Sequence, residues 1–186
     1  MGSGAIATKR LNLLRHAKSS WDDPVERDFD RPLNGRGHRA ARRMGEWLKE
    51  QQLQFDSVIA SPALRIRQTI EGVESGLGRK LSPVFDKRIY MASAASLFDI
   101  LRETPDSVET LLLIGHNPGL EDLLLLATEE DVSALRAEAE IKYPTATFAT
   151  IELDVESWAA AEEHMPGRLT AFVRPRDLDS TLGPDD

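Results

Sequence analysis

Short apolar segments of strand length alternate with stretches of helical periodicity, and this alternation restricts the fold of the chain more than any other feature. Three such segments cover residues 11–14, 55–60 and 110–114. Segment 110–114 is almost wholly apolar, which is typical of a central parallel strand covered on both faces. Strands that alternate with helices favour a parallel sheet with helices on both sides. The sequence therefore predicts an α/β protein, a three-layer α/β/α sandwich with a mostly parallel central sheet.

The length of the chain indicates one domain. Its 186 residues are enough to bury a sizeable core, and no internal repeat or linker divides them. We expect this domain to span residues 9–174. Segments 1–8 and 175–186 are predicted to be flexible termini, the second because it is polar and contains Pro175 and Pro184.

The composition narrows the classes of function. The net charge is −8, so a nucleic-acid partner is not expected without a segregated basic face. No apolar run approaches the ~20 residues that span a bilayer, so no membrane partner is expected. The absence of cysteine excludes a thiol nucleophile and a thiolate metal site, and it fits the reducing conditions of the cytoplasm. Binding of an anionic ligand to this acidic protein would therefore require a local cationic pocket.

Titratable or anion-binding side chains follow three of the predicted strands. Arg15 and His16 follow the first strand, Arg65 lies just beyond the second, and His116 follows segment 110–114. Ligands of open α/β sheets bind at the carboxyl ends of the strands. Each residue alone is more often an ordinary surface or core residue, but three such junctions at one sheet edge favour a shared pocket.

A phosphoryl group is the ligand that this combination predicts. The arginine guanidinium is a planar fork that suits phosphate oxygens, and an imidazole can be nucleophilic near neutral pH. A helix is expected to begin at Pro62 with Ser61 as its cap, and its N-terminus would also attract an anion. Lys18 and Asn117 are candidates for further phosphate contacts, and Asn117 is expected to cap the next helix.

The segment between the first strand and the first helix is predicted to be a long loop over the sheet edge. It covers residues 19–33, contains two prolines, and carries five acidic residues, most of which we expect to be solvated. His38 and His164 are expected to be surface residues.

These motifs resemble the histidine phosphatase superfamily, with its phosphoglycerate mutase-like fold, and more closely the small SixA-type phosphohistidine phosphatases. The resemblance spans roughly residues 9–176, and Ala17 stands where the family usually has glycine. It is carried by Leu14-Arg-His-Ala-Lys-Ser19, Arg31-Pro-Leu33 with Gly37, Ser61-Pro-Ala-Leu-Arg65 with Gln68-Thr69, Leu113-Ile-Gly-His-Asn-Pro-Gly119, Tyr143-Pro-Thr145 and the closing stretch 168–176.

The resemblance implies a mechanism. His16 would attack phosphorus and become transiently phosphorylated, while Arg15, Arg65 and His116 would bind the phosphoryl oxygens. Neither a metal ion nor another cofactor would be needed. The expected partner is a phosphorylated protein or a small phospho-compound.

One element of the family pattern is missing. Larger members carry a Glu after the third strand that protonates the leaving group, whereas residues 85–93 contain none. Asp22, Asp23 and Asp86 are the nearest candidates for a general acid. Since an imidazole can leave without a proton from the enzyme, the missing Glu favours a phosphohistidine substrate.

The sequence therefore predicts a metal-independent phosphatase that works through a phosphohistidine on His16, with protein phosphohistidine as the expected substrate. Two alternatives remain open, a small phosphate-monoester phosphatase and a non-catalytic module that binds a phospho-ligand. Measured turnover of any phospho-compound would separate the binding module from the two enzymes.

Overall fold

The computed structural model describes residues 8–129 and 133–184. Within them a six-stranded sheet has the order β3-β2-β4-β1-β5-β6. β1, β2, β3 and β4 pair in parallel, whereas β5 pairs antiparallel with both β1 and β6. The predicted mostly parallel sheet is therefore confirmed. The strands are β1 Lys9–Arg15, β2 Ser57–Ala60, β3 Val84–Phe85, β4 Thr110–Gly115, β5 Phe148–Leu153 and β6 Arg168–Val173.

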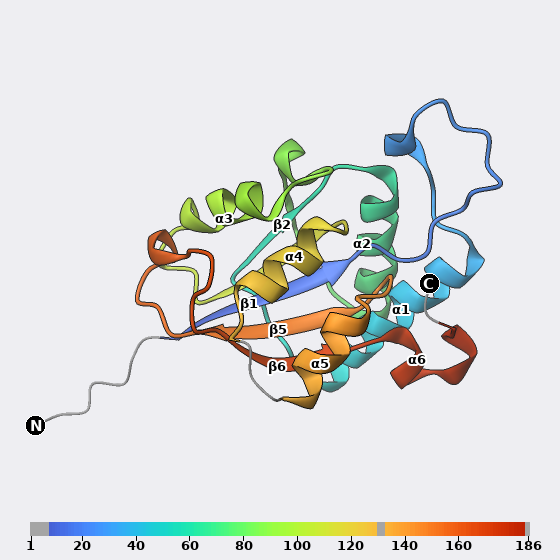
Figure 1. Ribbon diagram of the computed structural model, residues 1–186. Helices are drawn as coiled ribbons and strands as arrows, with labels where there is room; N and C mark the ends of the chain where they lie inside the picture. The colour runs from blue at the N-terminus through green and yellow to red at the C-terminus, as the bar shows by residue number, and fades with distance from the viewer. Residues whose placement is uncertain (1–7, 130–132, 185–186) are drawn as a thin grey trace, which may run out of the picture.

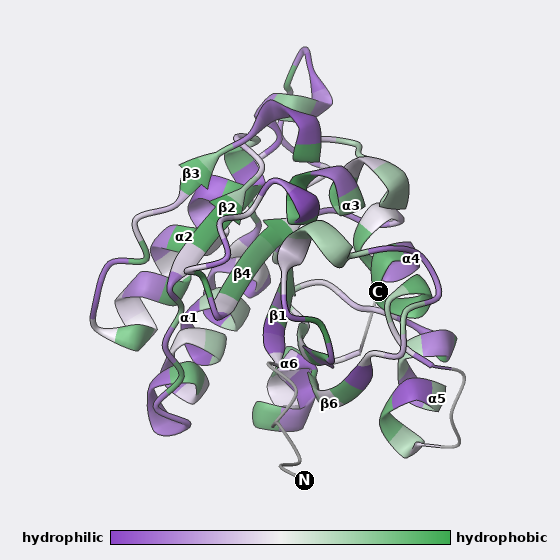
Figure 2. Ribbon diagram, turned by 90° about the vertical axis from the view of Figure 1, so that its left-hand side faces the viewer, coloured by the Kyte–Doolittle hydropathy of each residue, from purple (hydrophilic) through white to green (hydrophobic). Residues whose placement is uncertain are grey.

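Helices cover both faces of the sheet and make the three layers that the sequence predicts (Figure 1). α1 Gly35–Glu50 and α2 Leu64–Leu77 lie on one face, and α3 Ala94–Arg102 and α4 Gly119–Leu126 lie on the other. Along β4, Leu112 and Ile114 pack toward α1 and α2, while Leu111 and Leu113 pack toward α3 and α4. β4 is apolar along its length for this reason, as Figure 2 shows. The remaining helices are α5 Ala134–Ile141, α6 Pro175–Leu178, and the 3-10 turns η1 Asp28–Asp30, η2 Lys87–Ile89, η3 Trp158–Ala160 and η4 Ser180–Leu182.

Glycines allow α1 and α2 to pack closely. A Cβ atom on Gly45 would lie 2.1 Å from the Val73 carbonyl oxygen, and one on Gly76 would lie 2.1 Å from the Arg42 carbonyl oxygen. Larger residues at either position would push the two helices apart. The contact fixes α2 relative to α1, and α2 carries Arg65.

The predicted flexible C-terminus is wrong for residues 175–184. α6 and η4 lie against α1, and the side chain of Leu182 is buried. The first turn of α6 is fixed because the Asp177 carboxylate accepts hydrogen bonds from the backbone N–H and the guanidinium of Arg174. One buried leucine in a polar segment is too weak a pattern to predict this packing. At the two ends, residues 1–7 and 185–186 lie outside the described residues.

Among the described residues, no helix combines the length and the apolar character that crossing a bilayer requires.

Candidate active site

The carboxyl ends of β1, β2 and β4 bring three junctions side by side. The backbone N–H of His16 donates to the Gly115 carbonyl at 3.1 Å, and that of Ser61 donates to the Ile114 carbonyl at 3.1 Å. The ladder of hydrogen bonds thus continues one residue beyond β1 and β2. His16, Ser61 and His116 are therefore placed next to one another by the register of the sheet.

A pocket of about 330 Å³ opens at this edge, a size that suits a small ligand. The structure brings Arg15, His16, Arg65 and His116 together in its wall. The centres of the two imidazole rings lie 5.4 Å apart, and both histidines are buried. The pocket is also lined by Lys18, Ser19, Trp21, Asp28, Arg31, Met91, Asn117 and Thr145.

The tautomer of His16 is fixed by its own backbone. Its Nδ1 lies 2.7 Å from the carbonyl oxygen of Ala17. Because a carbonyl only accepts, Nδ1 carries the hydrogen and Nε2 keeps a lone pair when the ring is neutral. Burial lowers the pKa of His16 well below its usual value, and the charge of Arg15 contributes to the decrease. His16 therefore has the form that a nucleophile needs.

His116 accepts a hydrogen bond in its contact with Ser61, whereas His16 donates one to Ala17. Its Nε2 lies 2.8 Å from Ser61 Oγ, and that oxygen accepts a hydrogen bond from the Ala63 N–H at 3.4 Å. The Ser61 hydroxyl can thus donate to Nε2, which leaves the hydrogen of a neutral His116 on Nδ1. This Nδ1 is buried and has no hydrogen-bond partner among the described residues. Burial lowers the pKa of His116 to about 3, with a further contribution from Arg65, so the ring offers an uncharged donor at neutral pH.

The predicted cap of α2 is wrong. The helix begins at Leu64 with Ala63 as its N-cap, and the Ser61 hydroxyl pairs with His116. Arg65 still lies in the first turn, as predicted, and its side chain is buried.

The pocket contains one carboxylate that the sequence analysis assigned to the solvated loop. Oδ2 of Asp28 lies 3.0 Å from Arg65 Nη2 and 2.9 Å from the Tyr90 hydroxyl, and its Oδ1 lies 2.8 Å from Arg31 Nη2. Burial acts to raise the pKa of Asp28, but the hydrogen bonds from Arg31 and Tyr90 and the charge of Arg65 outweigh it and hold the pKa at about 2. The spacing of Asp28 and Arg31, one helical turn apart, was a signal in the sequence that could have identified the pair.

The three predicted candidates for a general acid do not line the pocket. Asp22 and Asp23 are exposed on the loop. Asp86 caps η2 through the Arg88 N–H and forms an ion pair with the Arg88 side chain at 2.7 Å. The prediction is corrected on this point, because Arg88 engages Asp86 and the fold of the loop turns Asp28, not its neighbours, toward the pocket.

Lys18 and Asn117 both line the pocket. The predicted capping role of Asn117 is wrong, since the N-cap of α4 is Pro118. Nδ2 of Asn117 instead donates to Glu121 at 3.1 Å and to the Tyr143 carbonyl at 3.0 Å. These bonds hold Asn117 at the wall of the pocket.

α2 also holds both ends of the loop over the pocket. The Ala17 N–H donates to Thr69 Oγ1 at 2.9 Å, and the Leu33 N–H donates to Gln68 Oε1 at 2.8 Å. A Cβ atom on Gly37 would lie 2.1 Å from the Lys18 carbonyl oxygen, so α1 approaches the loop where only glycine fits.

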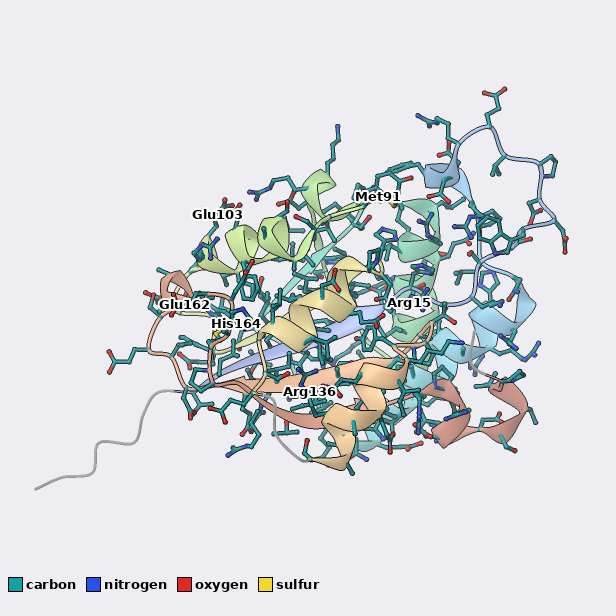
Figure 3. The ribbon with its side chains drawn as sticks, in the orientation of Figure 1. Arg15, Met91, Glu103, Arg136, Glu162 and His164 are labelled. Carbon is teal, nitrogen blue, oxygen red and sulfur yellow. The ribbon has the colours of Figure 1, made fainter. Side chains whose placement is uncertain are left out.

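Other histidines lie elsewhere. His38 and His164 are exposed, as predicted, and Figure 3 places His164 well away from Arg15. Within the described parts of the chain, no cluster of three or more His, Cys, Asp and Glu side chains could hold a metal ion.

Comparison with known proteins gives one consistent family. Residues 11–90 match the family described as the histidine phosphatase superfamily (branch 1). An uncharacterized protein of Mycobacterium tuberculosis is 34% identical over 167 residues, which cover 88% of this chain and 100% of that protein. The phosphohistidine phosphatase SixA of Escherichia coli is 31% identical over 114 residues, which cover 57% of this chain and 66% of that protein. A crystal structure from Agrobacterium tumefaciens, provisionally assigned as phosphohistidine phosphatase SixA, is 29% identical with a TM-score of 0.73, covering 90% of this chain and 98% of that chain.

Proposed function

The chain belongs to the histidine phosphatase superfamily, which supports a phosphatase activity, and we propose that it removes the phosphoryl group from phosphohistidine side chains of a protein. The observation that carries this proposal is the geometry around His16. A neutral imidazole with a free lone pair lies beside buried donors of Arg65 and His116 that have no hydrogen-bond partner among the described residues. Buried polar groups are normally paired, and a phosphoryl oxygen is a fitting partner for these donors.

The first step is a transfer of the phosphoryl group to His16. Its Nε2 lone pair forms a new bond to phosphorus while the bond from phosphorus to the substrate nitrogen breaks. The electron pair of the broken bond goes to the substrate imidazole, which already carries a proton on its other nitrogen and leaves as a neutral molecule. The Ala17 carbonyl accepts from Nδ1 at 2.7 Å and stabilises the charge that the His16 ring gains.

Arg15, Arg65 and His116 would stabilise the phosphoryl group during this transfer. Positive charges and donors that are held in place by the fold lower the energy of a transition state in which charge is redistributed. Arg15 is held by a hydrogen bond of 2.8 Å from its Nη1 to the Tyr143 carbonyl.

Hydrolysis of phospho-His16 completes the cycle. A water oxygen attacks phosphorus, the bond from phosphorus to Nε2 breaks, and its electron pair returns to Nε2. The proton that the water loses stays on inorganic phosphate, so His16 returns to its starting form.

One observation favours the alternative of a phosphate-monoester phosphatase. Asp28 lies in the pocket, and a phosphate dianion beside it would act to raise the pKa of its carboxyl group. An Asp28 that gained a proton in this way could protonate an alkoxide leaving group.

A phosphorylated protein remains the favoured partner, and a cytoplasmic location remains a prediction of the sequence.

Rapid-quench labelling tests the proposal. A phosphohistidine peptide labelled with ³²P should transfer acid-labile label to His16, and the chain with His16→Ala should lose turnover by at least about a thousandfold while it remains folded. The control His38→Ala replaces an exposed histidine and should leave turnover unchanged. Full activity of the His16→Ala chain would contradict the proposal.

A further inference from the structure

Trp21 lies at the mouth of the pocket with one face of its indole ring covered. The guanidinium carbon of Arg31 lies 3.8 Å from the centre of this ring. The Trp21 side chain is nevertheless 77% exposed, and it lines the same pocket as His16. The indole therefore has a second face that is open to a ligand.

Arg31 gives the indole a fixed support. Arg31 is buried, and its guanidinium donates to Asp28 Oδ1 at 2.8 Å and to Ser19 Oγ. Ser19 forms a β-bridge with Leu33 that closes the base of the loop. The indole thus rests on a side chain that shares its carboxylate partner with Arg65, so its position relative to the proposed phosphate site is set by the fold.

Met91 adds a second apolar side chain at the mouth. It is 66% exposed and lines the same pocket, and Figure 3 shows it at the same end of the molecule as Arg15. A pocket with a charged floor and two apolar side chains at its rim suits a phosphoryl group that carries an apolar substituent.

The chemistry of the pocket restricts that substituent further. The open face of an indole binds best to another flat ring, since aromatic pairs stabilise each other beyond the area that they bury. An alkyl leaving group has no flat face to stack.

We infer that Trp21 is the platform on which a flat leaving group such as an imidazole stacks while its phosphoryl group lies against His16. Trp21 would thereby select ring-bearing substrates such as phosphohistidine. This inference rests on the proposed function and specifies its substrate class through a residue outside the phosphate-binding set.

Binding to a chain that cannot turn over the ligand tests Trp21 directly. In the His16→Ala background, calorimetry would compare two peptides of one sequence, which carry either the stable triazole phosphonate analogue of phosphohistidine or phosphoserine. Adding Trp21→Ala should weaken binding of the triazole peptide by about five- to tenfold. It should leave the affinities for the phosphoserine peptide and for vanadate unchanged.

Two further variants separate stacking from support of the loop. Trp21→Phe keeps a ring and should retain most of the affinity for the triazole peptide. Val25→Ala removes an exposed apolar side chain of the same loop that does not line the pocket, and it should change neither affinity.

The inference is overturned if Trp21→Ala leaves the triazole peptide unaffected, or if it weakens both peptides and vanadate equally, since the indole would then only support the loop. Turnover by the chain with an intact His16 is a separate measurement. If no phospho-compound is hydrolysed, the proposed function fails, and the binding data still decide the role of Trp21.

Discussion

The carboxylate of Asp28 lies 3.0 Å from the guanidinium of Arg65, so an acidic side chain sits on one of the groups proposed to bind phosphate. An incoming anion must share Arg65 with Asp28 or displace it, and the two negative charges repel. We predict that Asp28→Asn, which keeps the size of the side chain and removes its charge, tightens vanadate binding by about three- to tenfold. Calorimetry on the wild-type and variant chains measures the difference.

A matched control for this variant is Asp30→Asn. Asp30 lies in the same turn, but its ion pair is with the exposed Arg27 at 2.8 Å, so vanadate affinity should not change. Weaker binding by Asp28→Asn would contradict the prediction and would show that Asp28 mainly holds Arg65 in place.

The four central site residues could be predicted because each follows a strand closely. Arg15, His16 and His116 lie at or within one residue of a strand end, and Arg65 lies in the first turn of the helix after β2. Apolar runs and helical periodicity in the neighbouring sequence locate these strand and helix ends, and with them the four residues.

Asp28 could not be placed in this way, because nothing in its neighbourhood fixes the path of the loop. That path depends on the bridge from Ser19 to Leu33 and on the hydrogen bonds that Gln68 and Thr69 of α2 accept from the backbone. The cap of α2 was missed for a similar reason, since the partner of the Ser61 hydroxyl is His116, 55 residues further along the chain.

The contact between Ser61 and His116 leads to a prediction about the imidazole tautomer. We assign Ser61 as the donor to Nε2, and this direction places the hydrogen of the neutral ring on Nδ1. We expect the ¹⁵N chemical shifts of His116 to show a protonated Nδ1 in the wild-type chain and a mixture of tautomers after Ser61→Ala. Because the Nδ1–H donor is then only partly present, vanadate affinity should fall by about two- to fivefold.

Ser61→Thr keeps the hydroxyl and should restore both the ¹⁵N pattern and the affinity. A wild-type spectrum with the hydrogen on Nε2 would refute the assigned direction of this hydrogen bond.

The buried histidines should make stability depend on pH. The pKa values of His16 and His116 are lowered in the folded chain, whereas unfolded histidine titrates near 6.5. Below that pH the unfolded state binds more protons, so the free energy of unfolding falls as the pH decreases, and for His116 the window extends down to its pKa of about 3. Above pH 7 the two groups contribute no pH dependence. For His116 the expected loss is about 2 kcal/mol between pH 7 and pH 5, and His16 adds to the loss in the same direction.

Urea unfolding at pH 7.5, 6.0 and 5.0 measures this loss. His116→Asn should remove its share of the pH dependence, whereas His38→Asn, at an exposed position, should retain the wild-type slope. An unchanged slope in the His116→Asn chain would show that His116 is not held neutral.

The last prediction concerns the missing proton donor. Asp22 and Asp23 are exposed outside the pocket, and Asp86 is paired with Arg88. Asp28 does line the pocket, but its pKa of about 2 leaves it ionised at neutral pH. An alkoxide leaving group needs a proton that this site does not supply, whereas an imidazole can leave as a neutral molecule. We therefore expect kcat/KM for a phosphohistidine peptide to exceed that for the matched phosphoserine peptide by at least about a hundredfold.

The size of this preference has two separable sources. Stacking on Trp21 acts on ring substrates in the ground state and in the transition state alike, so Trp21→Ala should change mainly KM. The missing acid acts on the chemical step, so a large difference in kcat should persist in the Trp21→Ala chain.

A preference for phosphoserine would contradict the prediction and would mean that Asp28 gains a proton when a phosphate dianion binds beside it. In that case Asp28→Asn should abolish ester hydrolysis while it spares phosphohistidine turnover, and the same pair of peptides measures both.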